Sequence, residues 1–239
     1  MLLARHGVAT PMLALHEHNE RAVVPRLVER LHGGESLALI SDAGTPLISD
    51  PGYRLVEAAR AAGVRVSTVP GPSALIAALS ISGLPSDRFA FEGFLPAKPA
   101  ARRARLAALV EDPRTLVFYE AKHRIEETLA DLAAALGAGR RAAVARELTK
   151  LHETVLDGTL AELAARVAAD PEQRLGEFVV VVAGAPERDD DARRLAEGER
   201  VMKLLIDERV PASSAAKLAA KITGAPKNAL YRGKGDGLN

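Results

Sequence analysis

The chain has 239 residues and a mass of 25.3 kDa, and 48% of its residues are hydrophobic, which is enough to fill the cores of one large or two modest globular domains. It contains no cysteine and no tryptophan, which excludes disulfides, thiolate zinc sites, iron–sulfur clusters and a cysteine nucleophile. The net charge of +1 provides no bulk attraction to nucleic acid, so any contact with phosphates must come from local basic clusters.

The N-terminal residues Met1–Gly7 lack the long apolar core of a secretory signal. No uninterrupted run approaches the roughly 20 apolar residues that are needed to cross a bilayer. The absence of cysteine also fits a reducing compartment. We therefore expect a cytoplasmic protein with no membrane segment.

The first third of the chain alternates apolar runs with helical patterns, which is typical of a largely parallel sheet. The predicted strands are Met12–Leu15, Leu37–Ser41 and Val66–Val69. The predicted helices are Asn19–Arg30, Gly52–Ala62 and Ser73–Ile81. These elements predict an N-terminal α/β domain over residues 1–92.

The middle of the chain also mixes strand and helix patterns. The predicted strands are Phe89–Glu92, Thr115–Tyr119, Ala142–Glu147, Glu153–Leu156 and Glu177–Ala183. The predicted helices are Ala100–Val110, His123–Leu136 and Thr159–Ala169, the last with threonine as its cap. A second α/β domain is therefore predicted over residues 93–187.

The pattern is purely helical over residues 188–239. The predicted helices are Leu195–Asp207, Ala212–Ile222 and Lys227–Tyr231. The last two are joined by the short turn Thr223–Pro226, the arrangement of a helix-turn-helix. Small dimerisation modules use the same spacing, so this pattern alone does not establish nucleic-acid binding.

Two loops that follow predicted strands carry the candidate ligand site. Asp42-Ala-Gly-Thr-Pro46 offers a carboxylate, a hydroxyl and exposed amides, and Gly71-Pro-Ser73 opens a helix. The first loop lacks the second carboxylate of a phosphatase because position 44 is glycine, and no glycine-rich phosphate motif occurs in the chain. Helix-start amides favour a carboxylate, and Asp42 can accept from an amine or a ribose hydroxyl. The pair suits a ligand that is part amino acid and part nucleoside, although ordinary tight turns use the same residues.

Three further segments are polar. His16-Glu-His-Asn-Glu20 has no third ligand at metal-site spacing, so a polar cleft edge or a helix cap at Asn19 is the better interpretation. Tyr119-Glu120 and Arg146–Glu153 place charged groups at strand ends, where either catalytic groups or structural ion pairs are found. A basic cluster lies between the first and the second of these segments, and it comprises Lys98, Arg102, Arg103 and Arg105. Such a cluster fits either a solvated face or contacts with phosphates.

Several motifs occur in one order along the chain. They are Ser41–Tyr53, Val69–Ala74, Phe91–Pro96, Phe118–Glu120, Arg146–Lys150 and Thr223–Tyr231. Together they resemble the ribosomal RNA small subunit methyltransferase I family. The resemblance implies a tetrapyrrole-methylase-like fold, in which two α/β domains hold S-adenosylmethionine between them, with a small C-terminal helical domain.

The resemblance also implies an activity, the transfer of a methyl group to a cytidine 2′-hydroxyl of 16S ribosomal RNA in the small subunit, by a homodimer without a metal. The residues expected to line the cofactor are Asp42, Ala43, Gly44, Thr45, Pro46, Ser73, Ala74, Ala183 and Gly184. The candidate proton acceptors are Glu120, Glu147 and His16. The residues expected to bind RNA phosphates are Lys98, Arg102, Arg103, Arg105 and Lys227.

The start of the chain departs from the family pattern. Met1–Gly7 resembles a later part of the family's first domain, so a strand, its glycine-bearing loop and an acidic segment are expected to be missing. Such a loss would remove part of the site and expose strand edges. Two alternatives to the rRNA methyltransferase follow: a tetrapyrrole methyltransferase of the same fold, and a ribosome-binding module that no longer binds the cofactor.

Overall fold

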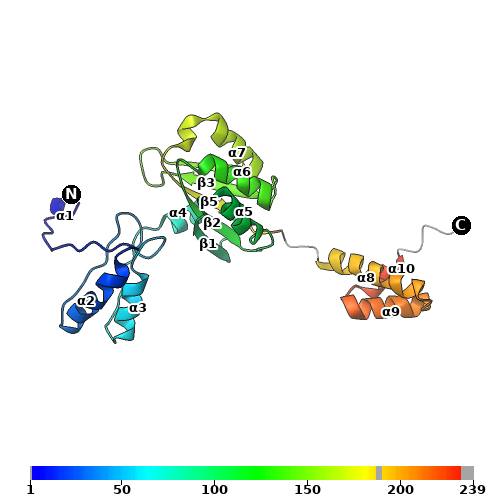
Figure 1. Ribbon diagram of the computed structural model, residues 1–239. Helices are drawn as coiled ribbons and strands as arrows, with labels where there is room; N and C mark the ends of the chain where they lie inside the picture. Colours follow the sequence, from blue (N-terminus) through cyan, green and yellow to red (C-terminus); the bar gives the residue numbers. More distant parts are fainter. Residues whose placement is uncertain (1, 187–189, 233–239) are drawn as a thin grey trace. The chain divides into compact units, whose positions relative to one another are not determined.

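The computed structural model describes residues 2–186 and 190–232 (Figure 1). The chain divides into two compact units, Met1–Gly184 and Ala185–Asn239. Among the described residues, no helix combines the length and the apolar character that a membrane span requires.

The first unit is built on a five-stranded mixed sheet. Its strands, in spatial order, are β1 (Phe89–Phe94), β2 (Thr115–Ala121), β5 (Glu177–Val182), β3 (Arg141–Arg146) and β4 (Thr154–Thr159). β1 and β2 are parallel, and β5 is antiparallel to both β2 and β3. β1, β2 and β3 therefore run in the same direction and end at one edge of the sheet, which we call the exit edge.

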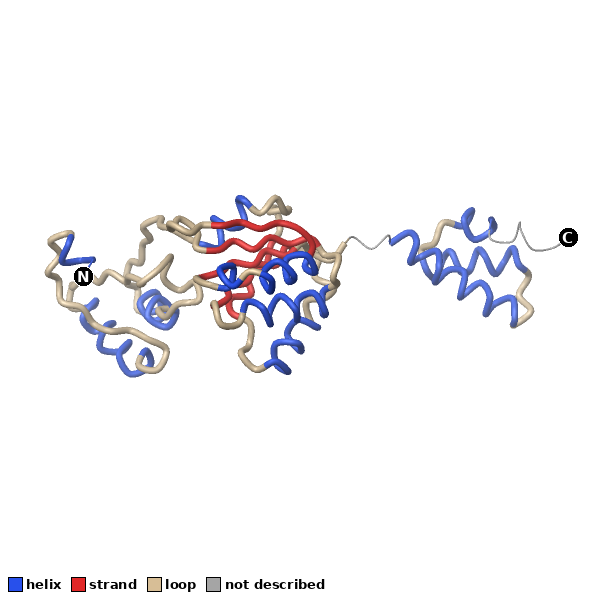
Figure 2. Tube along the Cα trace, turned by 90° about the horizontal axis from the view of Figure 1, so that it is seen from above, coloured by secondary structure: helices blue, strands red, loops and turns tan. Residues whose placement is uncertain are grey.

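Alternation along the strands builds a hydrophobic layer on each face of the sheet. In β5, Val180 and Val182 point to a cluster formed with α5 (Pro99–Ala107), α6 (Ile125–Leu136) and α7 (Leu160–Ala169). Val179 and Val181 point to the opposite cluster, which includes α4 (Ala74–Ile81). Figure 2 shows the strands side by side with helices packed against them.

The local signals of the sequence explain how these elements begin. Thr159 caps α7 in a capping box: its hydroxyl accepts from the amide of Glu162, and the Glu162 carboxylate accepts from the amide of Thr159 at 2.8 Å. The threonine cap predicted from the sequence is confirmed. The 3₁₀ helix η1 (Pro171–Arg174) leads from α7 to β5.

The N-terminal part of this unit contains helices but no strand among its described residues. Its helices are α1 (Leu2–Arg5), α2 (Glu20–His32) and α3 (Tyr53–Ala61). The strands predicted at Met12–Leu15, Leu37–Ser41 and Val66–Val69 are wrong, because these segments run without a strand partner. A strand is stable only within a hydrogen-bonded sheet, which a local apolar pattern cannot supply.

The helices α2 and α3 are joined by a buried carboxylate. Glu20 is buried, and its Oε1 accepts from the amides of Gly52 and Arg54 at 3.1 and 3.0 Å, at the start of α3. Asn19 occupies the N-cap position of α2 without capping it through its side chain. Its Oδ1 instead accepts from the amide of His16 at 2.9 Å, which fixes the turn before α2.

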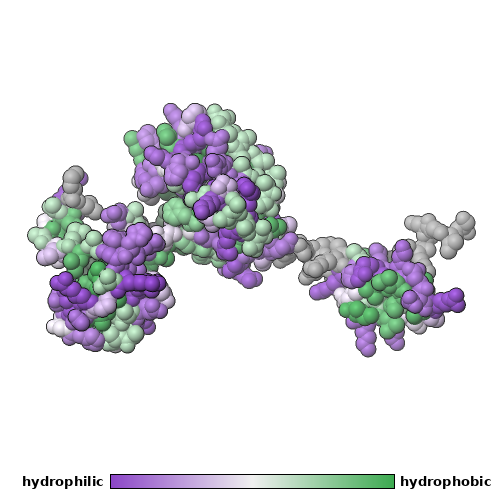
Figure 3. Space-filling view, viewed as in Figure 1, coloured by the Kyte–Doolittle hydropathy of each residue, from purple (hydrophilic) through white to green (hydrophobic). Residues whose placement is uncertain are grey.

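In the second unit, the described residues form the helices α8 (Asp190–Asp207), α9 (Ala212–Thr223) and α10 (Lys227–Arg232). They pack around a small core that includes Met202, Ala216 and Leu230. Gly224 ends α9 in the left-handed conformation, φ 74°, which glycine adopts without strain. Hydrophobic residues also reach the surface of this unit (Figure 3), where Ile222 is 67% exposed.

Candidate functional site

The two loops singled out in the sequence contact each other. The Thr45 hydroxyl donates to the Pro72 carbonyl at 2.8 Å, which joins Asp42–Pro46 to Gly71–Ala74. We call these segments the paired loops. Gly44 has φ +75°, and a Cβ there would lie 3.9 Å from the Pro72 carbonyl, an ordinary contact distance. Position 44 therefore requires glycine for its backbone conformation and not for lack of space.

Backbone strain is concentrated beside the paired loops. Leu47 and Ser49 are not glycine, yet they adopt φ values of 75° and 55°. Such conformations cost on the order of 1–3 kcal/mol each and cluster at ligand sites. The paired loops are exposed or half-buried, so their backbone is open to a ligand.

Tyr119 fixes the start of α4, which belongs to the paired loops. The Leu75 amide donates to the Tyr119 hydroxyl at 3.1 Å, and the Tyr119 ring packs edge-on against Phe91 with ring centroids 4.8 Å apart. Ser73 has extended backbone and makes no side-chain cap. The sequence analysis did not assign Tyr119 to the site, although a tyrosine near the end of a buried strand carries a hydroxyl that needs a hydrogen-bond partner.

Ala183 and Gly184 lie away from the paired loops. The register pairs Tyr119 with Val179 and Leu116 with Val182, so the end of β5 lies beside the start of β2. Four residues of strand, about 13 Å, separate this position from Tyr119. The structure does not bring Ala183 and Gly184 to the paired loops, and the close approach of Gly184 to the Pro113 carbonyl gives this glycine a packing role.

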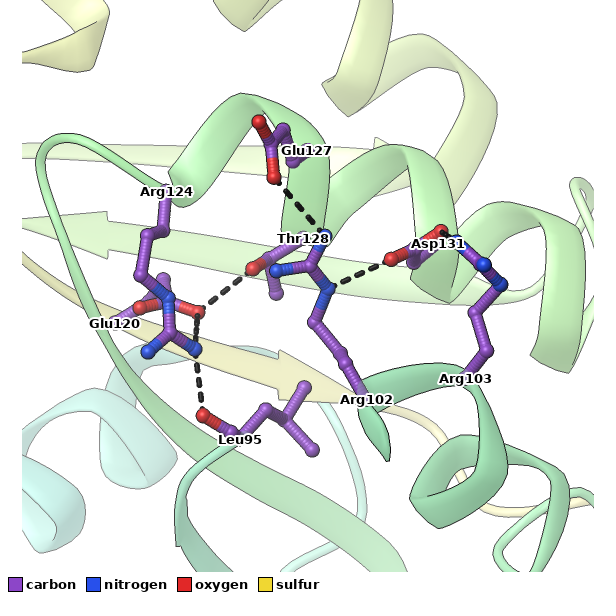
Figure 4. A network of polar contacts seen from close by, with 8 residues as sticks. All are labelled: Leu95, Arg102, Arg103, Glu120, Arg124, Glu127, Thr128 and Asp131. Carbon is purple, nitrogen blue, oxygen red and sulfur yellow. Dashed lines mark hydrogen bonds and ion pairs between the residues drawn. The ribbon is translucent and has the colours of Figure 1, made fainter. Parts of the chain in front are cut away.

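Glu120 is held inside the protein. Its side chain is fully buried, and its Oε2 accepts from Arg124 Nη2 at 3.1 Å and from the Thr128 hydroxyl at 2.7 Å (Figure 4). Its Oε1 accepts from the amide of Ala121 at 2.8 Å. Arg124 also donates to the Leu95 carbonyl at 2.6 Å. These contacts tie β2 to α6 and leave Glu120 no open side toward a substrate, so the structure gives it a structural role.

Glu147 is also occupied, but it lies closer to the surface. Its Oε1 accepts from Lys150 Nζ and from the amide of Glu177, both at 2.9 Å. The hydrogen bond from Lys150 and then that from Glu177 hold the pKa of the Glu147 carboxyl below its usual value. A lowered pKa makes this carboxylate a weaker base, which disfavours it as the proton acceptor.

This lowered pKa predicts a pH-dependent contribution to stability. The contribution is complete above the unfolded pKa of about 4.3 and disappears as the pH falls through the lower folded value. Glu147→Gln should therefore reduce the free energy of unfolding at pH 7 by about 1 kcal/mol or less, because its partner Lys150 is 47% exposed. At a pH below both the folded and the unfolded pKa of Glu147, the substitution should not change the free energy of unfolding. Urea titrations at several pH values measure this, and Lys150→Met should reproduce the pattern.

His16 lies on an exposed loop before α2, and its ring centroid is 6.1 Å from that of His18. No contact within the described residues joins His16 to the paired loops. The described residues also contain no group of three or more metal-ligating side chains.

The basic cluster divides into buried and exposed members. Arg102 is 2% exposed and paired with Asp131 and Glu127 (Figure 4), so it cannot contact RNA phosphates as the sequence analysis expected. The Arg103 side chain is 58% exposed, and that of Arg105 is 49% exposed although it pairs with Glu92 at 2.5 Å. Lys98 is exposed beside α5, and Lys227 lies at the start of α10 in the second unit.

Comparisons with known proteins agree with this architecture. Residues 3–164 match the family model described as Tetrapyrrole (Corrin/Porphyrin) Methylases, and residues 192–232 match the RsmI C-terminal HTH domain, which confirms the helix-turn-helix prediction. The crystal structure of the methyltransferase CobJ superimposes with a TM-score of 0.50 at 23% identity, covering 69% of this chain and 71% of that chain, which supports the fold alone.

Several curated proteins that are similar in sequence to this chain share one name. The protein "Ribosomal RNA small subunit methyltransferase I" of Xylella fastidiosa (strain Temecula1) is 66% identical over 97% of this chain and 84% of its own length. Its namesake in Pseudomonas aeruginosa is 58% identical over 97% of this chain and 82% of its own length, and that of Escherichia coli O157:H7 is 48% identical over 97% and 80%. The chain therefore belongs to the ribosomal RNA small subunit methyltransferase I family, which has the tetrapyrrole-methylase fold.

Proposed function

We propose that this chain transfers a methyl group from S-adenosylmethionine to ribosomal RNA of the small subunit, at the 2′-hydroxyl of a cytidine ribose. The observation that carries the proposal is the 66% identity to a protein named for this kind of activity. The contact between Thr45 and Pro72 supports it, because it brings together the two loops suited to a nucleoside that bears an amino acid. A cytoplasmic homodimer that acts on the small subunit completes the proposal.

The paired loops fit the cofactor's functional groups. The start of α4, an eight-residue helix, places partial positive charge where the cofactor's carboxylate can lie. Asp42 is exposed and can accept from the cofactor's amine or a ribose hydroxyl, while Thr45 holds the two loops together. The cofactor, when bound, would supply a methyl group attached to a sulfonium sulfur, and the neutral thioether that remains after transfer would be the leaving group.

The protein's remaining tasks are to align the ribose hydroxyl, to exclude water and to accept a proton. Glu120 is sealed in the core and Glu147 is held as a weaker base. We retain the imidazole of His16 as the proposed acceptor, since it lies at the surface. Lys98, Arg103, Arg105 and Lys227 remain the proposed contacts to RNA phosphates.

Two measurements test the proposal. Calorimetric titration should detect S-adenosylmethionine binding, and the chain should transfer labelled methyl to RNA of isolated small ribosomal subunits. Thr45→Val removes the hydrogen bond to Pro72 and should weaken cofactor binding by about threefold to tenfold. Thr45→Ser keeps the hydroxyl and should bind like the unmodified chain.

The competing functions give different results. A folded chain that binds small subunits but not S-adenosylmethionine would indicate a ribosome-binding module. Methyl transfer to a corrin precursor, with none to RNA, would indicate the tetrapyrrole methyltransferase. Equal affinities of the Thr45→Val and Thr45→Ser variants for S-adenosylmethionine would show that the paired loops do not form the cofactor site.

A further inference from the structure

One aromatic ring at the exit edge is exposed although the backbone that carries it is fixed. Phe94 ends β1 and is 53% exposed. The next residue, Leu95, is buried, and its carbonyl accepts from Arg124 Nη2 at 2.6 Å (Figure 4). A single exposed apolar side chain is ordinary on a protein surface. A ring on a fixed backbone, however, loses little conformational entropy when a ligand covers it.

An irregularity in β1 decides on which face of the sheet this ring lies. Phe91 and Phe94 are three residues apart, so regular alternation would place their rings on opposite faces. The register instead shifts by one residue between Phe91 and Gly93, as in a β-bulge, and Gly93 has φ +64°. Phe94 is therefore paired with Tyr119, whose ring Phe91 also contacts, on the face that carries α4. Bulges of this kind re-aim side chains next to active sites.

The ring of Phe94 lies next to the candidate site. Its centroid is 5.7 Å from that of the Tyr119 ring, and the Tyr119 hydroxyl accepts from the amide of Leu75 at the start of α4. A Cβ on Gly93 would lie 3.1 Å from Ser49 Oγ, so the irregular part of β1 packs against one of the two strained residues beside the paired loops. A ligand that covers Phe94 is therefore held beside the proposed site of methyl transfer.

The charges near Phe94 indicate which partner covers the ring. Lys98 is exposed, and the four residues from Phe94 to Lys98 span at most about 14 Å. The Arg105 side chain is 49% exposed, whereas its partner Glu92 is only 9% exposed, so the accessible charge in this segment is mainly positive. Proteins that bind single-stranded RNA combine an aromatic ring that stacks on a base with cations that meet the phosphates. S-adenosylmethionine has no phosphate and does not need these cations.

We propose that Phe94 stacks on an unpaired nucleobase of the RNA substrate, while Lys98 and Arg105 meet the phosphates that flank this base; the assignment rests on the proposed function. Every base has a π-face, so the stack adds affinity and holds the strand in place without choosing among the four bases. The segment Phe91–Pro96 contributes to the family resemblance, but the sequence analysis gave Phe94 no role. The register shift that turns its ring toward α4 is not visible in the alternation of the sequence.

The test measures binding of the full chain to isolated small ribosomal subunits and to the RNA extracted from them, by filter binding at several salt concentrations. Phe94→Ala should weaken both by about tenfold, the loss of one stack between a base and an aromatic ring. The salt dependence should not change, because no charge is removed. Phe94→Tyr keeps an aromatic ring and should bind like the unmodified chain, whereas Phe94→Leu should bind as weakly as Phe94→Ala.

Two further variants serve as controls. Phe89→Ala removes a ring that is 37% exposed from the opposite end of β1, and it should leave the affinity for RNA unchanged. Lys98→Ala removes a charge instead of a ring, so it should weaken binding and lower the slope of the salt dependence by about one. Calorimetric titration with S-adenosylmethionine should give the same affinity for every variant, which also shows that each variant is folded.

Four results would overturn the assignment. In the first, the unmodified chain and Phe94→Ala bind the extracted RNA equally, or neither binds it. In the second, Phe94→Leu binds as tightly as Phe94→Tyr, so that any apolar side chain suffices. In the third, Phe94→Ala weakens binding to small subunits but not to the extracted RNA, which would indicate that a ribosomal protein covers the ring. In the fourth, Phe94→Ala weakens binding of S-adenosylmethionine instead of RNA.

Methyl transfer by the unmodified chain to small-subunit RNA is measured in parallel. If transfer occurs and Phe94→Ala binds RNA normally, the stacking assignment fails and the proposed function stands. If RNA binding depends on an aromatic ring at position 94 and no methyl is transferred, the stacking assignment is supported and the proposed function fails.

Discussion

Replacement of Arg102 by alanine is expected to lower the free energy of unfolding by about 3 kcal/mol, the lower end of the cost of breaking a buried ion pair. The Arg102 side chain is 2% exposed, and its Nε donates to Asp131 Oδ2 at 2.6 Å. Its Nη2 donates to Glu127 Oε2 at 3.1 Å. Removing the guanidinium leaves Asp131, which is 16% exposed, without its main partner between α5 and α6.

Arg103→Ala provides the matched control. Arg103 is the next residue along α5 and faces the same carboxylate, but its Nη1 lies 3.8 Å from Asp131 Oδ1 and its side chain is 58% exposed. An exposed pair of this kind contributes about 0–1 kcal/mol, so the loss should stay below about 1 kcal/mol. Urea unfolding followed by circular dichroism gives both values.

Equal losses of unfolding free energy in the two variants would contradict the argument that the Arg102 ion pair is buried.

The same variants separate stability from RNA binding. Arg103→Ala should reduce the affinity for small-subunit RNA in a salt-dependent way, because its guanidinium is exposed to phosphates. Any effect of Arg102→Ala on RNA binding should follow the loss of folded protein.

The strands and helices around the five-stranded sheet of the first unit could be predicted from the sequence, because the patterns that indicate them are local. The valine run of β5 and the Thr159 cap of α7 are read from a few consecutive residues. Pairing is not local. Leu37–Ser41 and Val66–Val69 have apolar strand patterns, yet Val69 is 91% exposed, since no neighbouring strand completes a ladder for it within the described residues.

The site could be predicted only in part for the same reason. The paired loops were recognised from their composition, and the structure brings them into contact through Thr45. Counting charges misplaced Arg102, which lies four residues before Leu106 on the buried face of α5, a spacing visible in the sequence. The partners of Glu120, which lie on α6 and its preceding turn, depend on how β2 and α6 pack together.

Gly184→Ala should also be strongly destabilising, by about 3 kcal/mol, which is at the upper end of the cost of overpacking. A Cβ at this position would overlap the carbonyl group of Pro113 and lie 2.8 Å from the carbonyl oxygen of Arg114. Neither segment can move easily, because the Ala183 amide donates to the Arg141 carbonyl at 2.9 Å and the Thr115 amide to the Arg88 carbonyl at 3.1 Å. The overlap must therefore distort the ends of two central strands.

Gly139→Ala is the control for this substitution, since a Cβ at Gly139 would meet no atom within 4 Å and its φ lies outside the left-handed range. Its effect should stay within about 1 kcal/mol, with either sign. Thermal unfolding and S-adenosylmethionine titration of both variants decide between a packing role and a cofactor contact for Gly184. If Gly184→Ala weakens cofactor binding while the unfolding temperature is unchanged, Gly184 belongs to the site and the packing argument is wrong. A lower unfolding temperature, with an unchanged affinity for S-adenosylmethionine in the fraction that remains folded, would support the packing role of Gly184.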